Sequence, residues 1–195
     1  MRFGKGAWAL VTALDLWLLS GSPCGAEAMR PTPIRALMDV LAEDRDAKHF
    51  DTCGAAPKLQ LNEVCSVGTE CDSDVRIADF VEVYNPTGQA APLACYVIAN
   101  DEDLPFVPRG QLEPGSLDAW GESQLQFRIA KKRDQVTLYR MHAIDGKPGL
   151  EVLDQVEVAA TQALAYRSPD GGGWVLVPAL DAEWEGPASF KRPNP

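Results

Sequence analysis

The feature that most limits the fold is a succession of short apolar runs, from Lys58 onward, that turn residues separate. The 16 glycines and 15 prolines of the 195-residue chain supply more turn chemistry than a helical protein needs. Eight runs have strand-like patterns: 58–64, 80–85, 94–99, 116–120, 125–129, 135–140, 152–158 and 173–177. Because short strands with frequent turns are typical of two packed antiparallel sheets, the sequence predicts an all-β sandwich.

The most regular alternation of polar and apolar residues lies at 124–129. In an extended chain it places Leu125, Phe127 and Ile129 on one side. We therefore expect a strand here, with these three side chains in the core.

Residues 1–28 have the pattern of a secretory signal peptide. Arg2 and Lys5 precede a mostly apolar stretch, 7–19, that is too short to span a bilayer. Ala26-Glu27-Ala28 supplies the small residues of a signal-peptidase site. We expect cleavage after Ala28, a secreted or periplasmic protein, and no membrane span after cleavage. A lipoprotein anchored at Cys24 is less favoured, because Ser22-Pro23 fits a lipid-attachment site poorly.

Residues 29–57 form a leader into the strand-rich region. Thr32 can cap a helix that has Pro33 at its first position. One apolar stripe follows at helical spacing: Ile34, Leu37, Met38 and Leu41. A helix this short either packs on the domain or remains a partly ordered linker.

Cleavage after Ala28 leaves four cysteines: Cys53, Cys65, Cys71 and Cys95. In an oxidising compartment four cysteines predict two disulfides, with three possible connectivities. Buried free thiols are the less favoured alternative. A zinc site is less favoured still, because there is no C-x-x-C motif and the only histidines are His49 and His142.

The formal net charge is −10 and the pI is near 4.6. This balance argues against nucleic acid as a partner bound through bulk charge. The only basic concentration is typical of an exposed turn: Arg128, Lys131, Lys132 and Arg133.

Seven short motifs follow one another in the strand-rich region. They are Leu61-Asn62-Glu63-Val64, Asp79-Phe80-Val81-Glu82-Val83-Tyr84-Asn85-Pro86, Pro92-Leu93-Ala94-Cys95-Tyr96-Val97-Ile98, Leu112-Glu113-Pro114-Gly115, Asp134-Gln135-Val136-Thr137-Leu138, Val152-Leu153-Asp154-Gln155-Val156 and Tyr166-Arg167-Ser168-Pro169-Asp170-Gly171. In this order they resemble the lamin-tail domain family in its bacterial, secreted form, over residues 58–195. The sequence departs from the family at Cys95, where Gly is frequent, and at 189–194, which matches the family's ending only loosely.

This resemblance implies an immunoglobulin-like antiparallel β-sandwich over residues 58–195. It also implies an exported, non-catalytic module that binds or tethers a protein, a polysaccharide or another component of the cell envelope. No cofactor is implied.

The implied sandwich also suggests how the cysteines pair. If the first two predicted strands run antiparallel, Cys53 lies at the end of the sheet where the chain turns from Asn85 toward Cys95. Cys65 and Cys71 both belong to the connection at the opposite end. We therefore expect the disulfides Cys53–Cys95 and Cys65–Cys71.

Two connections between strands are rich in carboxylates that could hold Ca²⁺. The candidate ligands are Asp72, Asp74, Asp79, Asp101 and Asp103. Asp72-Ser73-Asp74 resembles the opening of an EF-hand loop, but the glycine and the later glutamate are not at the required offsets. A Ca²⁺-dependent adhesive or structural module is therefore the alternative function, and a solvated acidic loop is the simpler interpretation.

The sequence contains no G-x-S-x-G elbow, no phosphate-binding glycine loop and no HExxH motif. No residue is assigned a catalytic role, and a small secreted hydrolase is the least favoured function.

Overall fold

The computed structural model describes residues 33–44, 47–66, 79–102, 104–129, 133–159 and 162–178, all within one compact unit. The predicted signal peptide, 1–28, lies outside the described residues. Among the helices in the described part, none is long and apolar enough to cross a membrane.

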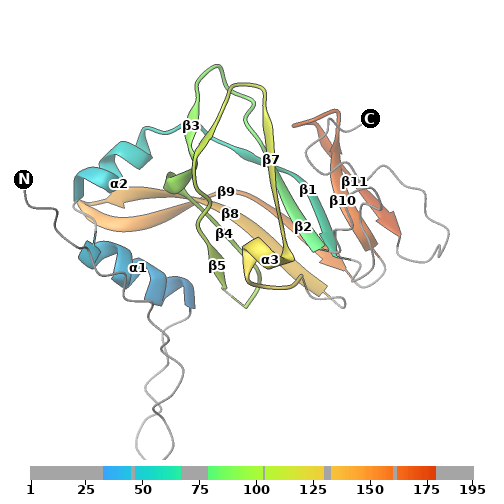
Figure 1. Cartoon of the computed structure of the whole chain (residues 1–195), viewed down its shortest axis with the longest axis horizontal. Coiled ribbons are helices and arrows are strands. Elements are labelled where there is room, and N and C mark those ends of the chain that lie inside the picture. Colours follow the sequence, from blue (N-terminus) through green and yellow to red (C-terminus); the bar gives the residue numbers. More distant parts are fainter. Residues whose placement is uncertain are drawn as a thin grey trace, which may run out of the picture. The chain divides into compact units, whose positions relative to one another are not determined.

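Two antiparallel sheets form the body of the protein (Figure 1), which confirms the predicted all-β sandwich. The strands are β1 (Gln60–Ser66), β2 (Asp79–Tyr84), β3 (Ala91–Pro92), β4 (Tyr96–Ala99), β5 (Pro105–Phe106), β6 (Gln111–Leu112), β7 (Leu117–Gly121), β8 (Arg133–Ile144), β9 (Lys147–Ala159), β10 (Gln162–Ser168) and β11 (Gly173–Pro178). The larger sheet has the order β11-β10-β1-β2-β7, the smaller one β5-β4-β8-β9, and β3 pairs with β6.

Apolar side chains on the facing sides of the two sheets form the core. The five-stranded sheet contributes Leu61, Val64, Val81, Val83 and Ala165, and the four-stranded sheet contributes Ile98, Val136, Leu138, Val156 and Val158. Because neighbouring residues of a strand point to opposite faces, the i, i+2 spacing of Val81 and Val83 puts both in this layer.

The leader packs on the sandwich as two helices, α1 (Pro33–Asp44) and α2 (Ala47–Gly54). The predicted start of α1 at Pro33 is confirmed, and Ile34, Leu37 and Met38 pack against the core. The side chain of Leu41 lies outside the described residues. Helix α2 was not predicted. In the region of the β8–β9 hairpin, α1 contacts β9 while α2 contacts both hairpin strands (Figure 1).

The predicted strand at 125–129 is wrong. A single helical turn, α3 (Glu122–Leu125), occupies its start, and Gln126 follows in the left-handed region at φ 62°. The chain must cross here from β7 in one sheet to β8 in the other, so it cannot continue either ladder. The expected burial is nevertheless confirmed, since Leu125, Phe127 and Ile129 are all buried.

The β8–β9 hairpin is longer than the sequence predicts. Asp145 and Gly146 form a two-residue turn with φ values of 51° and 71°, and pairing resumes at Lys147. Positive φ at both positions suits the right-handed twist of a hairpin. Pro148 is tolerated because β9 is an edge strand. The short strands β3, β5 and β6 and the whole of β10 were also not predicted.

Asn85 is fully buried and its side chain holds two turns together. Its amide nitrogen donates to the carbonyl oxygens of Gln89, Leu112 and Glu113 at 2.8, 3.1 and 3.2 Å. Its amide oxygen accepts from the backbone nitrogen of Thr87 at 3.1 Å. The turn after β2 and the turn after β6, far apart in sequence, are thereby fixed to each other.

The disulfide Cys53–Cys95 is present, as predicted. It joins α2 to η1 (Leu93–Cys95), the short 3₁₀ helix before β4. Cys65 is also disulfide-bonded, but its predicted partner Cys71 lies outside the described residues.

Replacing both Cys53 and Cys95 by alanine should destabilise the protein. The disulfide restricts the unfolded chain, and for a sequence separation of 42 residues this restriction stabilises the folded state by about 4 kcal/mol. The double variant should lose this contribution. Urea unfolding of the oxidised protein and the double variant measures the difference. Equal midpoints for the two proteins would contradict a stabilising role.

Candidate functional site

An ion pair between the two sheets organises the middle of the sandwich. β10 pairs with β1 from Glu63 onward, and the register of β1 against β2 shifts between Leu61 and Glu63. On the β10 side, side chains replace the strand partner of Leu61: its N–H donates to Asp154 Oδ2 at 3.0 Å and its carbonyl accepts from Arg167 Nε at 2.8 Å. Arg167 Nη2 also pairs with Asp154 Oδ2 at 2.8 Å. The pair therefore satisfies backbone groups that the bulge leaves without a strand partner.

The bulge residue Asn62 extends this network. Its amide nitrogen donates to Glu82 Oε1 at 2.9 Å and to Asp170 Oδ1 at 3.0 Å, and its oxygen accepts from Gly171 N at 3.0 Å. Gly171 has φ +71°, and a Cβ there would lie 2.9 Å from Gln60 Oε1. A glycine is therefore needed where the β10–β11 turn approaches β1.

Arg167 also fixes the neighbouring aromatic ring. Its guanidinium carbon lies 4.3 Å from the ring centre of Trp174, its cross-strand partner on β11. Its Nη1 donates to the carbonyl of Gly172 at 2.6 Å. Since its donors serve the fold, this arginine is structural.

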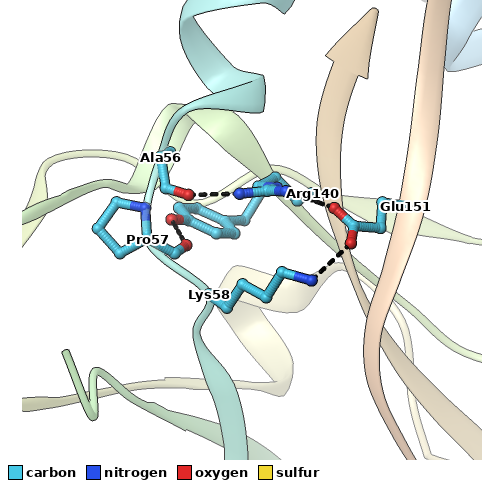
Figure 2. A network of polar contacts seen from close by, with 6 residues as sticks. Ala56, Pro57, Lys58, Arg140 and Glu151 are labelled. Carbon is cyan, nitrogen blue, oxygen red and sulfur yellow. Dashed lines mark hydrogen bonds and ion pairs between the residues drawn. The ribbon is translucent and has the colours of Figure 1, made fainter. Parts of the chain in front are cut away.

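A second polar network fastens the end of the leader to the β8–β9 hairpin (Figure 2). Arg140 donates to the carbonyl of Ala56 and pairs with Glu151, which also pairs with Lys58 at 2.9 Å. The hydrogen bond from Lys58, and next the bonds and charge of Arg140, hold the pKa of Glu151 below its usual value, against the opposing effect of burial. Charge thus holds chain segments before β1 to the hairpin, while the disulfide holds α2 to η1.

Tyr96 is buried beside this network, and its hydroxyl donates to the carbonyl of Pro57. Burial disfavours the charged phenolate and raises the pKa of Tyr96 to about 12, although the charge of Arg140 acts in the opposite direction.

His49 lies beside the disulfide. Its Nε2 is 3.4 Å from Cys53 Sγ, one helical turn away, and that sulfur is bonded to Cys95. These three residues bring possible metal-ligand atoms within 4.8 Å of one another. In the oxidised state the two sulfurs are not thiolates, which are the form that binds metal.

The predicted Ca²⁺ ligands are only partly described. Asp72, Asp74 and Asp103 lie outside the described residues, Asp79 is buried at the start of β2, and Asp101 is exposed after β4. The N–H of Asp101 donates to the buried Asp134 Oδ1 at 3.0 Å.

The topology nevertheless places Asp79 and Asp101 at the same end of the sandwich. Only two residues separate β9 from β10, so the strand ends they join lie within about 11 Å. At the end of β9, Ala159 pairs with Arg133 at the start of β8. Beside the start of β10, the end of β1 pairs with Asp79.

Two members of the predicted basic turn form ion pairs. Arg128 and Arg133 are exposed and pair with Glu122 and Glu157 at 2.5 and 2.7 Å. Lys131 and Lys132 lie outside the described residues.

The sequence predicts the strand at 173–177 but not that its apolar side chains are exposed at the end of the larger sheet. Val175 is 37 % exposed and Leu176 is 46 % exposed on β11. Leu176 lies opposite the buried Ala165 in the ladder, so it points to the face that elsewhere packs on the smaller sheet. The sequence signal was available, since no residue from Gly173 to Pro178 is charged.

Comparison with protein-family models, with curated proteins and with solved structures found no match. The lamin-tail resemblance therefore stays a prediction.

Replacing Tyr96 by phenylalanine should remove the bond to Pro57 and cost about 1 kcal/mol at neutral pH. A raised folded-state pKa contributes stability below the unfolded value of 10, and that stability is lost as pH rises through about 12. Between these pH values, the free energy of unfolding measured in urea should therefore fall more steeply for the natural protein than for Tyr96→Phe. Tyr139→Phe is the control, and parallel pH profiles for all three proteins would contradict the assignment.

Proposed function

We propose that this protein is an exported, non-catalytic binding or tethering module of the lamin-tail type. The observation that supports it is the apolar strand β11, which ends the five-stranded sheet within the described part of the chain. An exposed strand edge offers backbone donors and acceptors to an extended segment of a partner, and alternate side chains add selectivity.

The chemistry of β11 favours a protein partner over a polysaccharide. Carbohydrates are recognised through hydrogen-bonding side chains beside aromatic rings, whereas the exposed side chains of β11 are aliphatic. The charged groups of Arg167, which lies over Trp174 of β11, and of Asp154 bond to each other and to the backbone.

Leu176→Lys should reduce retention of the protein on isolated cell envelopes several-fold, because it places a charge on the proposed docking strand. Val152→Lys is the matched control, since Val152 is 54 % exposed on a different edge strand, β9. Protease treatment of the envelopes should abolish binding of the natural protein. Binding that survives the protease would point to a polysaccharide, and equal binding of both variants would contradict docking at β11.

A Ca²⁺-dependent adhesive module is the second candidate, favoured by the common position of Asp79 and Asp101 at one end of the sandwich. If Ca²⁺ binds the native state, millimolar Ca²⁺ should raise the thermal midpoint by several degrees and a chelator should reverse the rise. Asp101→Asn should reduce that rise, and an unchanged midpoint would remove this candidate.

A further inference from the structure

We propose that the partner of β11 is the β11 strand of a second copy of this chain. The two strands would pair antiparallel about a twofold axis and join two five-stranded sheets into one. This inference rests on the proposed function, because it names the occupant of the same edge.

The four strands that end the two larger sheets, in the part of the chain described, differ in how they are protected. β5 has only two residues, β7 contains Asp118, and β9 contains Glu151, Asp154 and Glu157. Short length and charged side chains are the features that prevent strands from pairing edge to edge. β11 has neither: it is six residues long and uncharged, and Pro178 is its last residue.

The sequence of β11 is compatible with itself. In an antiparallel pair of identical strands, each residue of one copy lies opposite a residue of the same strand in the other copy. An uncharged strand therefore places no like charges opposite each other. The same pairing of β9 would bring its carboxylates together across the axis. A twofold pair is also closed, because each copy uses the unprotected edge that β11 offers among the strands described, and no further copy can add there.

Two side chains of β11 remain exposed on the strand's two faces. β9 packs against β1 and β10, yet Leu176 remains 46 % exposed on that face of β11. β11 therefore extends beyond the cover that the smaller sheet provides. In the dimer, Leu176 and the half-buried Trp174 of one copy would cover the corresponding side chains of the other, while Val175 would do so on the opposite face.

The interface would be small and the dimer reversible. Pairing two six-residue strands buries less than the roughly 1,200 Å² typical of stable complexes. Each copy also has a net charge of −10, and this long-range repulsion opposes association until salt screens it. Dimerisation through an uncharged strand should therefore become stronger, not weaker, as salt is raised from about 10 mM to about 150 mM.

Sedimentation equilibrium of the oxidised, exported protein tests this directly, over concentrations from about 1 μM to about 500 μM. We expect the mean mass to rise toward twice the monomer mass. Leu176→Lys should raise the dissociation constant about tenfold or more, since it places two ammonium groups close to the axis. Val152→Lys adds the same charge on β9 and lowers the same net repulsion, so it should leave dimerisation unchanged or slightly stronger.

An unchanged thermal midpoint will confirm that each variant is folded, which is expected because both positions are exposed. A protein that stays monomeric throughout, whether or not another segment of the chain covers β11, would overturn the proposal. So would a dimer that Leu176→Lys does not weaken. If the protein is monomeric but Leu176→Lys still loses envelope binding, the proposed function remains and only the identity of the partner is wrong.

Discussion

The ion pair between Arg167 and Asp154 is the contact on which the rest of the sandwich depends. It crosses from one sheet to the other and satisfies both backbone groups of Leu61 beside the bulge in β1. A largely buried ion pair contributes little net stability, because desolvation offsets the attraction. Removing one partner leaves the other charge and one backbone group of Leu61 unsatisfied: its carbonyl if Arg167 is removed, its N–H if Asp154 is removed. Its effect is therefore to specify one arrangement: it fixes the register of β1, places Asn62 between β2 and the β10–β11 turn, and holds Trp174 at the base of the edge strand.

The two helices of the leader have a structural role, which follows from the length of the β8–β9 hairpin. Twelve- and thirteen-residue strands extend beyond the four residues of β4, which pairs with β8 only from Thr137 to Arg140. The outer part of a hairpin needs a packed layer of its own, since an isolated hairpin is at best marginally stable in water. Helices α1 and α2 contribute that layer. Disulfide Cys53–Cys95, together with the bonds of Arg140 and Tyr96 to the segment after α2, holds it in place.

The sandwich, the start of α1 and one disulfide could be predicted from the sequence because each depends on a local pattern. Alternation at 124–129 identified three buried side chains correctly but not their conformation, since burial follows from hydrophobicity whereas a strand also needs a neighbour to pair with. β10 was missed because Gln162–Ser168 contains two alanines and no regular alternation, and its place between β1 and β11 is set by tertiary pairing. The Arg167–Asp154 contact depends on a bulge and on a cross-sheet approach that no local pattern encodes.

The two ends of the five-stranded sheet differ in a way that bears on function. At the β7 end the chain leaves through α3, whose Gln124 side chain accepts a bond from Gly121 N, and β7 includes a charge that discourages pairing. At the β11 end the ladder with β10 keeps the strand extended, and Arg167 lies over the ring of Trp174. In the part of the chain that the structure describes, β11 is therefore an edge strand whose exposed side chains, Val175 and Leu176, are apolar. In a chain with net charge −10, an uncharged edge is the place where contact with an equally acidic surface meets the least local repulsion. Leu176 lies on the inner face of β11, where β9 leaves it exposed. Burial of this apolar side chain would stabilise such a contact.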